Sequence, residues 1–192
     1  EALAGKITLL DDMRETLGAT LRALGYSYNA TNPEQIRAAF ERLQTLKPAI
    51  AVFQSFGWED QLVAGDLDIC MTYSHIGNTL PAEYPNLRYI IPSSGSSLWT
   101  DTMVIPKAAP NPAAAYAWLN FMLEPETAAF AVERLRFATP SQAAFALLPA
   151  ELQESETLFP PESVIANCEG IAPLDLATAD LFDRYWTELM SS

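Results

Sequence analysis

The chain has few basic residues and no basic run. Its 192 residues include only 11 lysines and arginines against 24 aspartates and glutamates, which gives a formal net charge of -13 at pH 7. Proteins that bind nucleic acid need clustered basic side chains to neutralise phosphates. The scarcity of such side chains argues against nucleic acid as a partner. An acidic surface attracts cations, which gives weak support to a cationic ligand.

Histidine and cysteine are also scarce. His75 is the one histidine, and Cys70 and Cys168 are the two cysteines. Their spacing matches no metal-binding motif, so we expect no metal site. The cysteines could form a disulfide or remain two buried thiols, because their separation in sequence says nothing about their distance in space. A single histidine is weak evidence for a ligand, and we interpret His75 as a solvated loop residue.

The sequence lacks a long apolar run and a recognisable leader. No stretch approaches the roughly 20 uncharged apolar residues of a membrane-spanning helix. The chain begins at Glu1, without an initiator methionine or a charged leader followed by an apolar core. We therefore expect a piece of a longer protein. Its 49% hydrophobic content predicts a globular chain with one substantial core or two small lobes.

Strands and helices alternate through the first half of the chain. Apolar runs and helical spacing of apolar residues predict strands at residues 6–10, 49–53, 67–73, 87–91 and 98–105, and helices at residues 13–24, 33–47 and 58–64. This order is typical of an α/β fold with an open sheet flanked by helices and right-handed crossovers. The loop-forming residues 92–97 indicate the approach to a hinge.

The second half is more helical. Asn111-Pro112 and Pro125-Glu126 predict helices that end at Leu123 and near Leu135. Residues 137–140 predict a turn, and 151–161 form a polar stretch. A last helix begins at residue 174 or 175, and the aromatic residues on its apolar side are most simply explained as core.

Two short segments carry candidate binding chemistry. Asp12 and Glu15 lie where the first predicted strand gives way to a helix, and Trp99 and Asp101 follow the loop at residues 92–97. Carboxylates and an indole are the groups that hold a small organic cation. Asp12 could instead be an N-cap, with Glu15 as the third residue of a capping box. The two roles are compatible, because a carboxylate can cap with one oxygen and face a cleft with the other.

Several colinear blocks then carry a family resemblance. The chain resembles the bacterial spermidine/putrescine-binding proteins, the extracytoplasmic receptors of polyamine ABC importers, in residues 5–15 (GKITLLDDMRE), 24–29 (LGYSYN), 97–106 (SLWTDTMVIP), 118–126 (WLNFMLEPE) and 137–141 (FATPS). The resemblance implies a lobe of a type II periplasmic-binding protein. Residues 1–100 and 146–192 would form the second lobe, and residues 101–145 would cross into the first lobe, most of which the chain lacks.

The resemblance also implies a set of ligand-binding residues: Asp12, Glu15, Tyr73, Trp99, Asp101 and Phe137. The three acids would pair with ammonium groups, and Trp99 would stack on the methylene chain. Tyr73 stands where the family often has Trp, and Phe137 where it commonly has Tyr. Near residues 168–171 the family usually offers an amide, and this sequence has no evident equivalent. These departures concern which polyamine is preferred.

The resemblance implies a receptor and not an enzyme. Such a receptor would need no cofactor. It would close on a polyamine, deliver it to a membrane permease and lie in the periplasm or another extracytoplasmic space. One alternative keeps the fold and binds ferric iron, thiamine or another small solute. A second uses Asp12, Glu15 or Asp101 as an acid/base pair in hydrolysis, although no nucleophile with an adjacent base is legible.

The missing lobe has a physical consequence. The helices between residues 112 and 135 would expose apolar faces that pack on the absent part of the protein, and such patches seldom stay bare. We expect the chain to self-associate or to pair with a separate N-terminal fragment.

Overall fold

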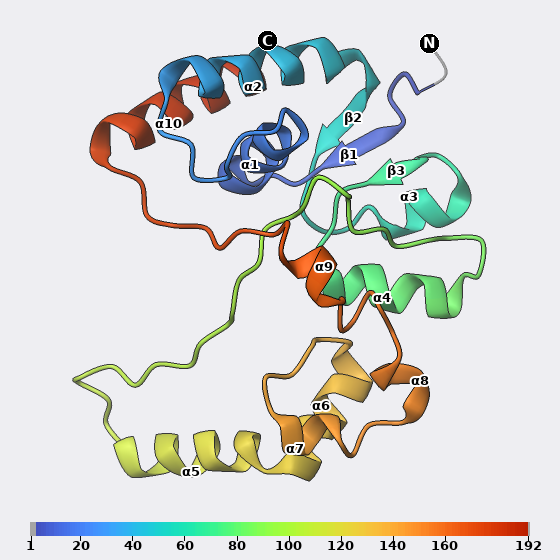
Figure 1. Ribbon diagram of the computed structural model, residues 1–192, viewed down its shortest axis with the longest axis vertical. Helices are drawn as coiled ribbons and strands as arrows, with labels where there is room; N and C mark the ends of the chain where they lie inside the picture. Colours follow the sequence, from blue (N-terminus) through green and yellow to red (C-terminus); the bar gives the residue numbers. More distant parts are fainter. Residues whose placement is uncertain (1–2, 192) are drawn as a thin grey trace. The chain divides into compact units, whose positions relative to one another are not determined.

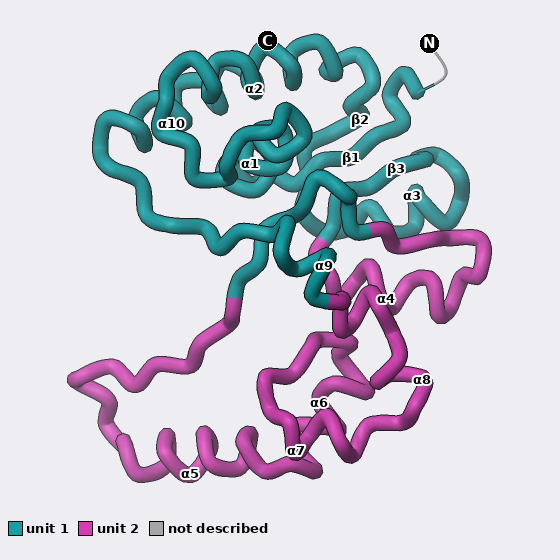
Figure 2. Tube along the Cα trace, viewed as in Figure 1, with its two compact units in different colours: residues 1–72, 91–99, 162–192 teal, residues 73–90, 100–161 magenta. Residues whose placement is uncertain are grey.

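The computed structural model describes residues 3–191 (Figure 1). The chain folds into two compact units, which Figure 2 colours separately. Unit 1 contains the segments up to Thr72, from Ile91 to Trp99 and from Glu162 onward; unit 2 contains Tyr73–Ile90 and Thr100–Pro161. The chain therefore passes between the units four times, after Thr72, Ile90, Trp99 and Pro161. The lobe boundaries implied by the family resemblance stay a prediction.

Unit 1 is built on a small parallel sheet. Its three strands, in the order β2-β1-β3, are β1 (Ile7–Leu9), β2 (Ile50–Phe53) and β3 (Ile69–Cys70). Ile7 of the central strand pairs with Ile50 on one side and Ile69 on the other. Parallel neighbours need long crossover connections, which helices provide here. The predicted α/β class with parallel strands is confirmed.

The helices of unit 1 are α1 (Met13–Ala23), α2 (Pro33–Leu46), α3 (Glu59–Ala64), α9 (Glu162–Ile165) and α10 (Leu176–Ser191), with a 3-10 turn η1 (Lys47–Ala49) after α2. Local signals place their ends. The side chain of Asn32 caps α2, whose first residue is a proline, and Gly65 ends α3 in the left-handed region at φ +81°. The helices expected at residues 13–24, 33–47 and 58–64 are confirmed within a residue or two.

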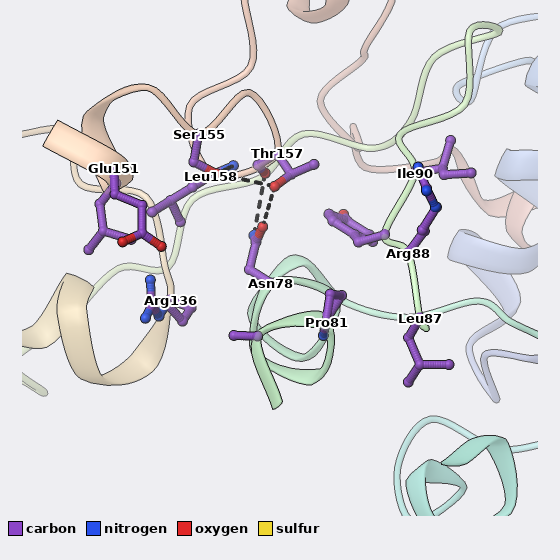
Figure 3. A pocket seen from close by; sticks show the side chains of 14 residues that line it. Asn78, Pro81, Leu87, Arg88, Ile90, Arg136, Glu151, Ser155, Thr157 and Leu158 are labelled. Carbon is purple, nitrogen blue, oxygen red and sulfur yellow. Dashed lines mark hydrogen bonds between the residues drawn. The ribbon is translucent and has the colours of Figure 1, made fainter. Parts of the chain in front are cut away.

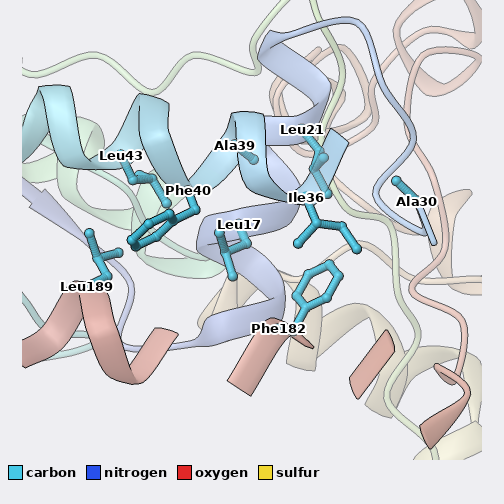
Figure 4. Close-up of a cluster of buried hydrophobic side chains, with 9 residues drawn as sticks. All are labelled: Leu17, Leu21, Ala30, Ile36, Ala39, Phe40, Leu43, Phe182 and Leu189. Carbon is cyan, nitrogen blue, oxygen red and sulfur yellow. The ribbon is translucent and has the colours of Figure 1, made fainter. Parts of the chain in front are cut away.

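Helices α1, α2 and α10 pack on one another and enclose the main core (Figure 4). The buried side chains of this core are Leu17, Leu21, Ala30, Ile36, Ala39, Phe40, Leu43, Phe182 and Leu189. The ring of Tyr185 stacks on Phe40 at 4.6 Å, and Trp186 meets the ring of Phe53 edge-on. The aromatic residues of the last helix are core residues, as their spacing predicts.

Unit 2 is helical, with α4 (Ser74–Glu83), α5 (Pro112–Leu123), α6 (Pro125–Leu135), α7 (Gln142–Phe145) and α8 (Ala150–Gln153). A smaller core joins α6 and α7 to the segment that follows them. Its buried residues are Ala129, Val132, Ala144, Leu148, Leu152 and Leu158. The predicted helices at 112–123 and 125–135 are confirmed with their proline starts.

Helix α5 is rich in apolar residues, yet none of its side chains is buried among the described residues. Tyr116, Trp118, Phe121 and Leu123 are 47–69% exposed, and Phe130 of α6 is 62% exposed. Ala115, Leu119 and Met122 of α5 are half-buried, whereas the larger apolar side chains lie largely uncovered by the part of the chain that the structure describes, which is unusual for a helix this apolar. Among residues 3–191, none of the helices has the length and apolar character needed to cross a bilayer.

The predictions of two strands are wrong. Residues 87–91 and 98–105 form no strand, and only a single parallel bridge joins Ser97 to Glu169. Ile90 and Val104 are 73% and 80% exposed. A strand forms only beside another strand with which its backbone can pair. Residue composition does not indicate whether such a partner is present.

Helix α4 was missed, and the strand expected at residues 67–73 is shorter than predicted. Only Ile69 and Cys70 pair with β1, and the chain then enters α4, whose N-cap position is Tyr73. Gly77 and Pro81 lie inside α4, and both residue types disfavour helices. Gly77 is needed because a Cβ there would lie 2.4 Å from the ring of Tyr89. Packing therefore overrides helix propensity in this segment.

We expect the core between α1, α2 and α10 to dominate the stability of unit 1. Leu189→Ala removes a fully buried side chain from α10 and should lower the free energy of unfolding by about 2–5 kcal/mol. Leu176→Ala makes the same change on the same helix at a position that is 79% exposed, and should cost less than about 0.5 kcal/mol. Urea unfolding followed by tryptophan fluorescence measures both. Equal losses would contradict this assignment of the core.

Candidate ligand-binding residues

The first turn of α1 follows the central strand of the sheet. Asp12 is the N-cap of α1, and its Oδ1 accepts a hydrogen bond of 2.9 Å from the backbone N–H of Glu15. The hydroxyl of Thr16 donates to the carbonyl of Leu10 at 2.8 Å, which closes the corner between β1 and α1. In open α/β sheets, ligands bind at the carboxyl ends of strands. The predicted capping role of Asp12 is confirmed, and its other carboxylate oxygen is left for a second role.

The Glu15 side chain does not complete a capping box. The residue is only 6% exposed, and its Oε2 accepts a hydrogen bond of 2.7 Å from the hydroxyl of Ser97. The expected return bond to the N-cap backbone is therefore wrong for Glu15, because the loop at residues 92–97 offers a better donor. A buried carboxylate that is not used for capping needs another reason to be there.

Burial raises the pKa of the Glu15 carboxyl above its ordinary value, because water no longer solvates the charge. The Ser97 hydrogen bond lowers it again, the neighbouring Asp12 carboxylate raises it, and the Arg14 guanidinium lowers it. Arg14 itself donates to the carbonyl of Ala172 and to the side chain of Asn29. A cation placed against Glu15 would favour its charged form.

The segment that carries Ser97 also carries Trp99. Two backbone hydrogen bonds flank Ser97: Glu169 donates to the carbonyl of Ser96 at 3.0 Å, and Leu98 donates to the carbonyl of Glu169 at 2.9 Å. Trp99 follows directly and is 49% exposed. Unit 1 therefore links the turn with Asp12 and Glu15 to the segment with Trp99, through a contact between residues more than eighty positions apart.

Unit 2 brings two of the other predicted residues close to each other. The His75 ring lies 6.3 Å from the Tyr73 ring at an interplanar angle of 12°, and 5.0 Å from the Phe137 ring. His75 is half-buried in the first turn of α4, so its interpretation as a solvated loop residue is wrong. Asp101 is exposed, outside any helix or strand, and forms no hydrogen bond or ion pair with the described residues.

Unit 2 also contains a cavity of about 530 Å³ that sequence reasoning missed (Figure 3). Asn78 of α4 points to Thr157, which donates to its side-chain oxygen at 2.6 Å, and Thr157 also contacts the hydroxyl of Ser155. Arg88 and Arg136 lie on opposite sides of Asn78 in this view. None of the predicted site residues lines this cavity, which opens among the side chains of α4, α8 and the segments beside them.

The described residues offer no metal site of the usual kind. Within residues 3–191 there is no group of three or more His, Cys, Asp or Glu side chains that could hold a metal ion. Cys70 and Cys168 are both free thiols, which decides between the two alternatives that the sequence left open. Burial, helped by the Glu59 carboxylate, raises the pKa of Cys70 to about 11.

Ser97 and His75 are the neighbours of the predicted residues that sequence reasoning did not select. Ser97 belongs to a run of loop-forming residues that contains other serines, and nothing in the sequence distinguishes it from them. Its distinction comes from pairing with Glu169, a contact that no local pattern predicts. His75 stands two positions after Tyr73. Helix α4 starts at Ser74, between the two residues, and the two rings lie on the same side of the chain.

Comparison with known proteins gives a consistent result. Residues 1–160 match the sequence profile of a family described as "Bacterial extracellular solute-binding protein". The chain is 31% identical over 185 residues to the spermidine/putrescine-binding periplasmic protein of Escherichia coli (strain K12). That alignment covers 96% of the chain and 53% of the relative. The chain thus spans about half the length of the curated relatives it matches.

Solved structures agree with the sequence comparison. A structure from Listeria monocytogenes, assigned to a spermidine/putrescine ABC transporter, has a TM-score of 0.90 at 33% identity and matches 98% of this chain and 58% of its own. The spermidine/putrescine ABC transporter substrate-binding protein of Streptococcus pneumoniae has a TM-score of 0.87 at 31% identity, with the same coverage. The fold implied by the sequence resemblance is confirmed.

We expect Ser97→Ala to raise the pKa of Glu15 further. The substitution removes the one hydroxyl that donates to this buried carboxylate, and that hydrogen bond favours the charged form. With a raised pKa, Glu15 would begin to lose its charge at a higher pH as the solution is acidified. Carbon-13 NMR of labelled glutamate carboxyls, with Glu15→Gln to assign the resonance, measures the shift. An unchanged or lowered pKa would show that Ser97 does not support the charge.

Proposed function

Because the chain belongs to the bacterial extracellular solute-binding proteins, we propose that it forms part of a receptor for polyamines such as spermidine and putrescine. In this proposal the receptor takes its ligand outside the cytoplasm and delivers it to the permease of an ABC importer. It is a binding protein and not an enzyme. The names of the relatives support this class of ligand.

The observation that carries the proposal is the buried carboxylate of Glu15 beside the N-cap Asp12. Burying a carboxylate is unfavourable unless its charge is compensated, and the described residues give Glu15 one hydroxyl donor, a neighbouring acid and the charge of Arg14, whose guanidinium donates its hydrogen bonds to Ala172 and Asn29. Like-charged neighbours at the end of a strand become favourable once an ammonium group sits between them. A polyamine supplies ammonium groups at fixed intervals along an alkyl chain.

Aromatic side chains complete the chemistry that we propose. The exposed indole of Trp99 would cover the methylene chain, and a cation over such a ring contributes about 0.5–2 kcal/mol. In unit 2, Asp101 would bind a second ammonium group, while Tyr73 and Phe137 would add flat walls. Phe137 has no hydroxyl, so it would contribute a surface and no hydrogen bond. Each charge-assisted hydrogen bond from an ammonium group to a carboxylate would add about 1.5–3 kcal/mol.

The alternatives receive less support from the described residues. A ferric iron receptor needs clustered His, Tyr or carboxylate ligands, and no cluster of metal-binding acids, histidines and cysteines occurs in residues 3–191. A hydrolase would need a positioned acid/base pair with a nucleophile. Asp12 is committed to the cap of α1 by one oxygen, which favours a role in binding.

Asp101→Asn should weaken polyamine binding by at least tenfold. The substitution keeps the side-chain shape and removes the charge, so an ammonium group of the ligand would be left without its partner in a closed site. Isothermal titration of the full-length protein with spermidine, putrescine and spermine measures the effect. Asp183→Asn is the matched control, because it removes the same charge from an exposed position on α10 and should leave the affinity unchanged.

The outcomes separate the alternatives. Unchanged affinity in Asp101→Asn would remove this residue from the site. Equal weakening in both variants would point to the overall charge instead of a contact. If the unaltered protein binds no polyamine, the ligand has to be sought among other small solutes.

We also propose that the exposed apolar face of α5 and α6 is covered by the remainder of a longer protein. Without that remainder, the 192-residue chain should associate with itself or with an added N-terminal fragment. Sedimentation velocity should show oligomers that Phe121→Gln weakens. Phe56→Gln in unit 1 changes a comparably exposed phenylalanine outside this face and should not weaken them. A monodisperse monomer with no second peptide present would contradict the proposal.

A further inference from the structure

We infer that Arg22 is a positioning residue for the ligand site, acting through the segment that carries Ser97 and Trp99. This inference rests on the proposed function, because it assumes that Glu15 and Trp99 contact the ligand. Arg22 lies on α1, two turns beyond Glu15. Its role would be to hold the 94–99 segment at a fixed place against α1.

The Arg22 guanidinium is shared among several acceptors from two other segments. Its Nη1 lies 2.7 Å from Oε1 of Glu169, its Nη2 donates to the carbonyl of Asn167 at 2.9 Å, and its Nε donates to the carbonyl of Ser94 at 3.1 Å. The side chains of Arg22 and Glu169 are only 20% and 25% exposed. A planar guanidinium with fixed donor directions can bind all these acceptors at once, which lysine cannot.

Glu169 completes what we call the Arg22 clamp, formed by Arg22, Ser27 and Glu169. The hydroxyl of Ser27 donates to Oε2 of Glu169, so both carboxylate oxygens are engaged. The backbone of Glu169 in turn forms the two hydrogen bonds that flank Ser97. Glu169 is therefore held by Arg22 and Ser27 through its side chain, and its backbone holds the segment around Ser97.

The clamp lies where the two segments approach each other closely. Gly95 has φ +98°, and a Cβ at this position would lie 1.8 Å from the carbonyl oxygen of Asn167. Both facts require glycine, and the second places Gly95 directly against the backbone of Asn167. Arg22 donates to a carbonyl on each side of this contact.

Trp99 follows this arrangement directly along the chain. Its side chain is 49% exposed, and the preceding Leu98 is 52% exposed. The last backbone hydrogen bond before Trp99 is the one from Leu98 to Glu169. A shift of Glu169 would shift the hydroxyl of Ser97 and the backbone that leads into Trp99. The site would then lose its shape without the loss of any group that touches the ligand.

Arg22→Lys tests the inference with the net charge preserved. Removal of a positive charge would favour a cationic ligand by simple attraction, and lysine avoids that effect. The matched control is Arg37→Lys on α2, where the guanidinium pairs with Glu34 and Glu41 at an exposed surface. The full-length protein is labelled with 5-fluorotryptophan, Trp99→Phe assigns the Trp99 resonance, and polyamine affinity is measured by calorimetry.

The expected result is a displaced Trp99 fluorine resonance in the ligand-free Arg22→Lys protein and a loss of polyamine affinity of at least fivefold. The resonances of Trp58 and Trp186, both in unit 1, should stay in place, and Arg37→Lys should change neither readout. If all three resonances move, Arg22 has a general structural role and the inference fails. It also fails if the Trp99 resonance and the affinity match those of the unaltered protein.

A second variant covers the case in which Arg22→Lys does not fold. Ser27→Ala removes one donor to Glu169 without any change of charge, and should displace the Trp99 resonance in the same direction by a smaller amount. An unmoved resonance in Ser27→Ala would overturn the inference. The NMR result is independent of ligand, so absence of polyamine binding in the unaltered protein would overturn the proposed function while the clamp is still judged by the Trp99 resonance.

Discussion

One constraint holds the loop at residues 92–97 against helix α1: the burial of the Glu15 carboxylate. A carboxylate taken out of water needs a donor, and the backbone N–H of Glu15 itself donates to Asp12. The donor has to come from elsewhere in the chain, and Ser97 provides it. A remote loop is thereby fixed against the N-terminus of a helix. Strand β1 leads into the corner at the start of α1, and the hydrogen bond from Ser97 to Glu15 holds the loop at residues 92–97 beside that corner.

This arrangement explains how one short acidic segment can serve both structure and recognition. Asp12 holds the helix end with one oxygen, which is a task that every helix terminus requires. Glu15 accepts one hydrogen bond, from Ser97, and feels the charge of Arg14, yet burial still raises its pKa. A cationic ligand would supply the compensation that the protein does not. In the function that we propose, the stability of the turn and the affinity for a cation would depend on different atoms of neighbouring side chains.

Local signals predict much of the fold, and the contacts between distant segments explain what they miss. The strand before Asp12 and the proline starts of α2, α5 and α6 are legible because capping and periodicity are local. The strands expected at 87–91 and 98–105 fail because pairing requires a partner that the sequence does not name. Helix α4 forms despite Gly77 and Pro81 because Tyr89 packs on it. The roles of Ser97 and Glu169 likewise arise only in three dimensions.

The half-buried thiol on β3 has a consequence for the chemistry of the environment that we propose for the protein. Oxidants react with the thiolate form of cysteine, and the pKa of Cys70 is raised to about 11. At pH 7, about four units lower, roughly one molecule in ten thousand carries the reactive anion at this position. A low thiolate fraction slows the oxidation of Cys70 relative to an exposed thiol. The partial burial of Cys70 on β3 therefore also lowers the reactivity of its sulfur.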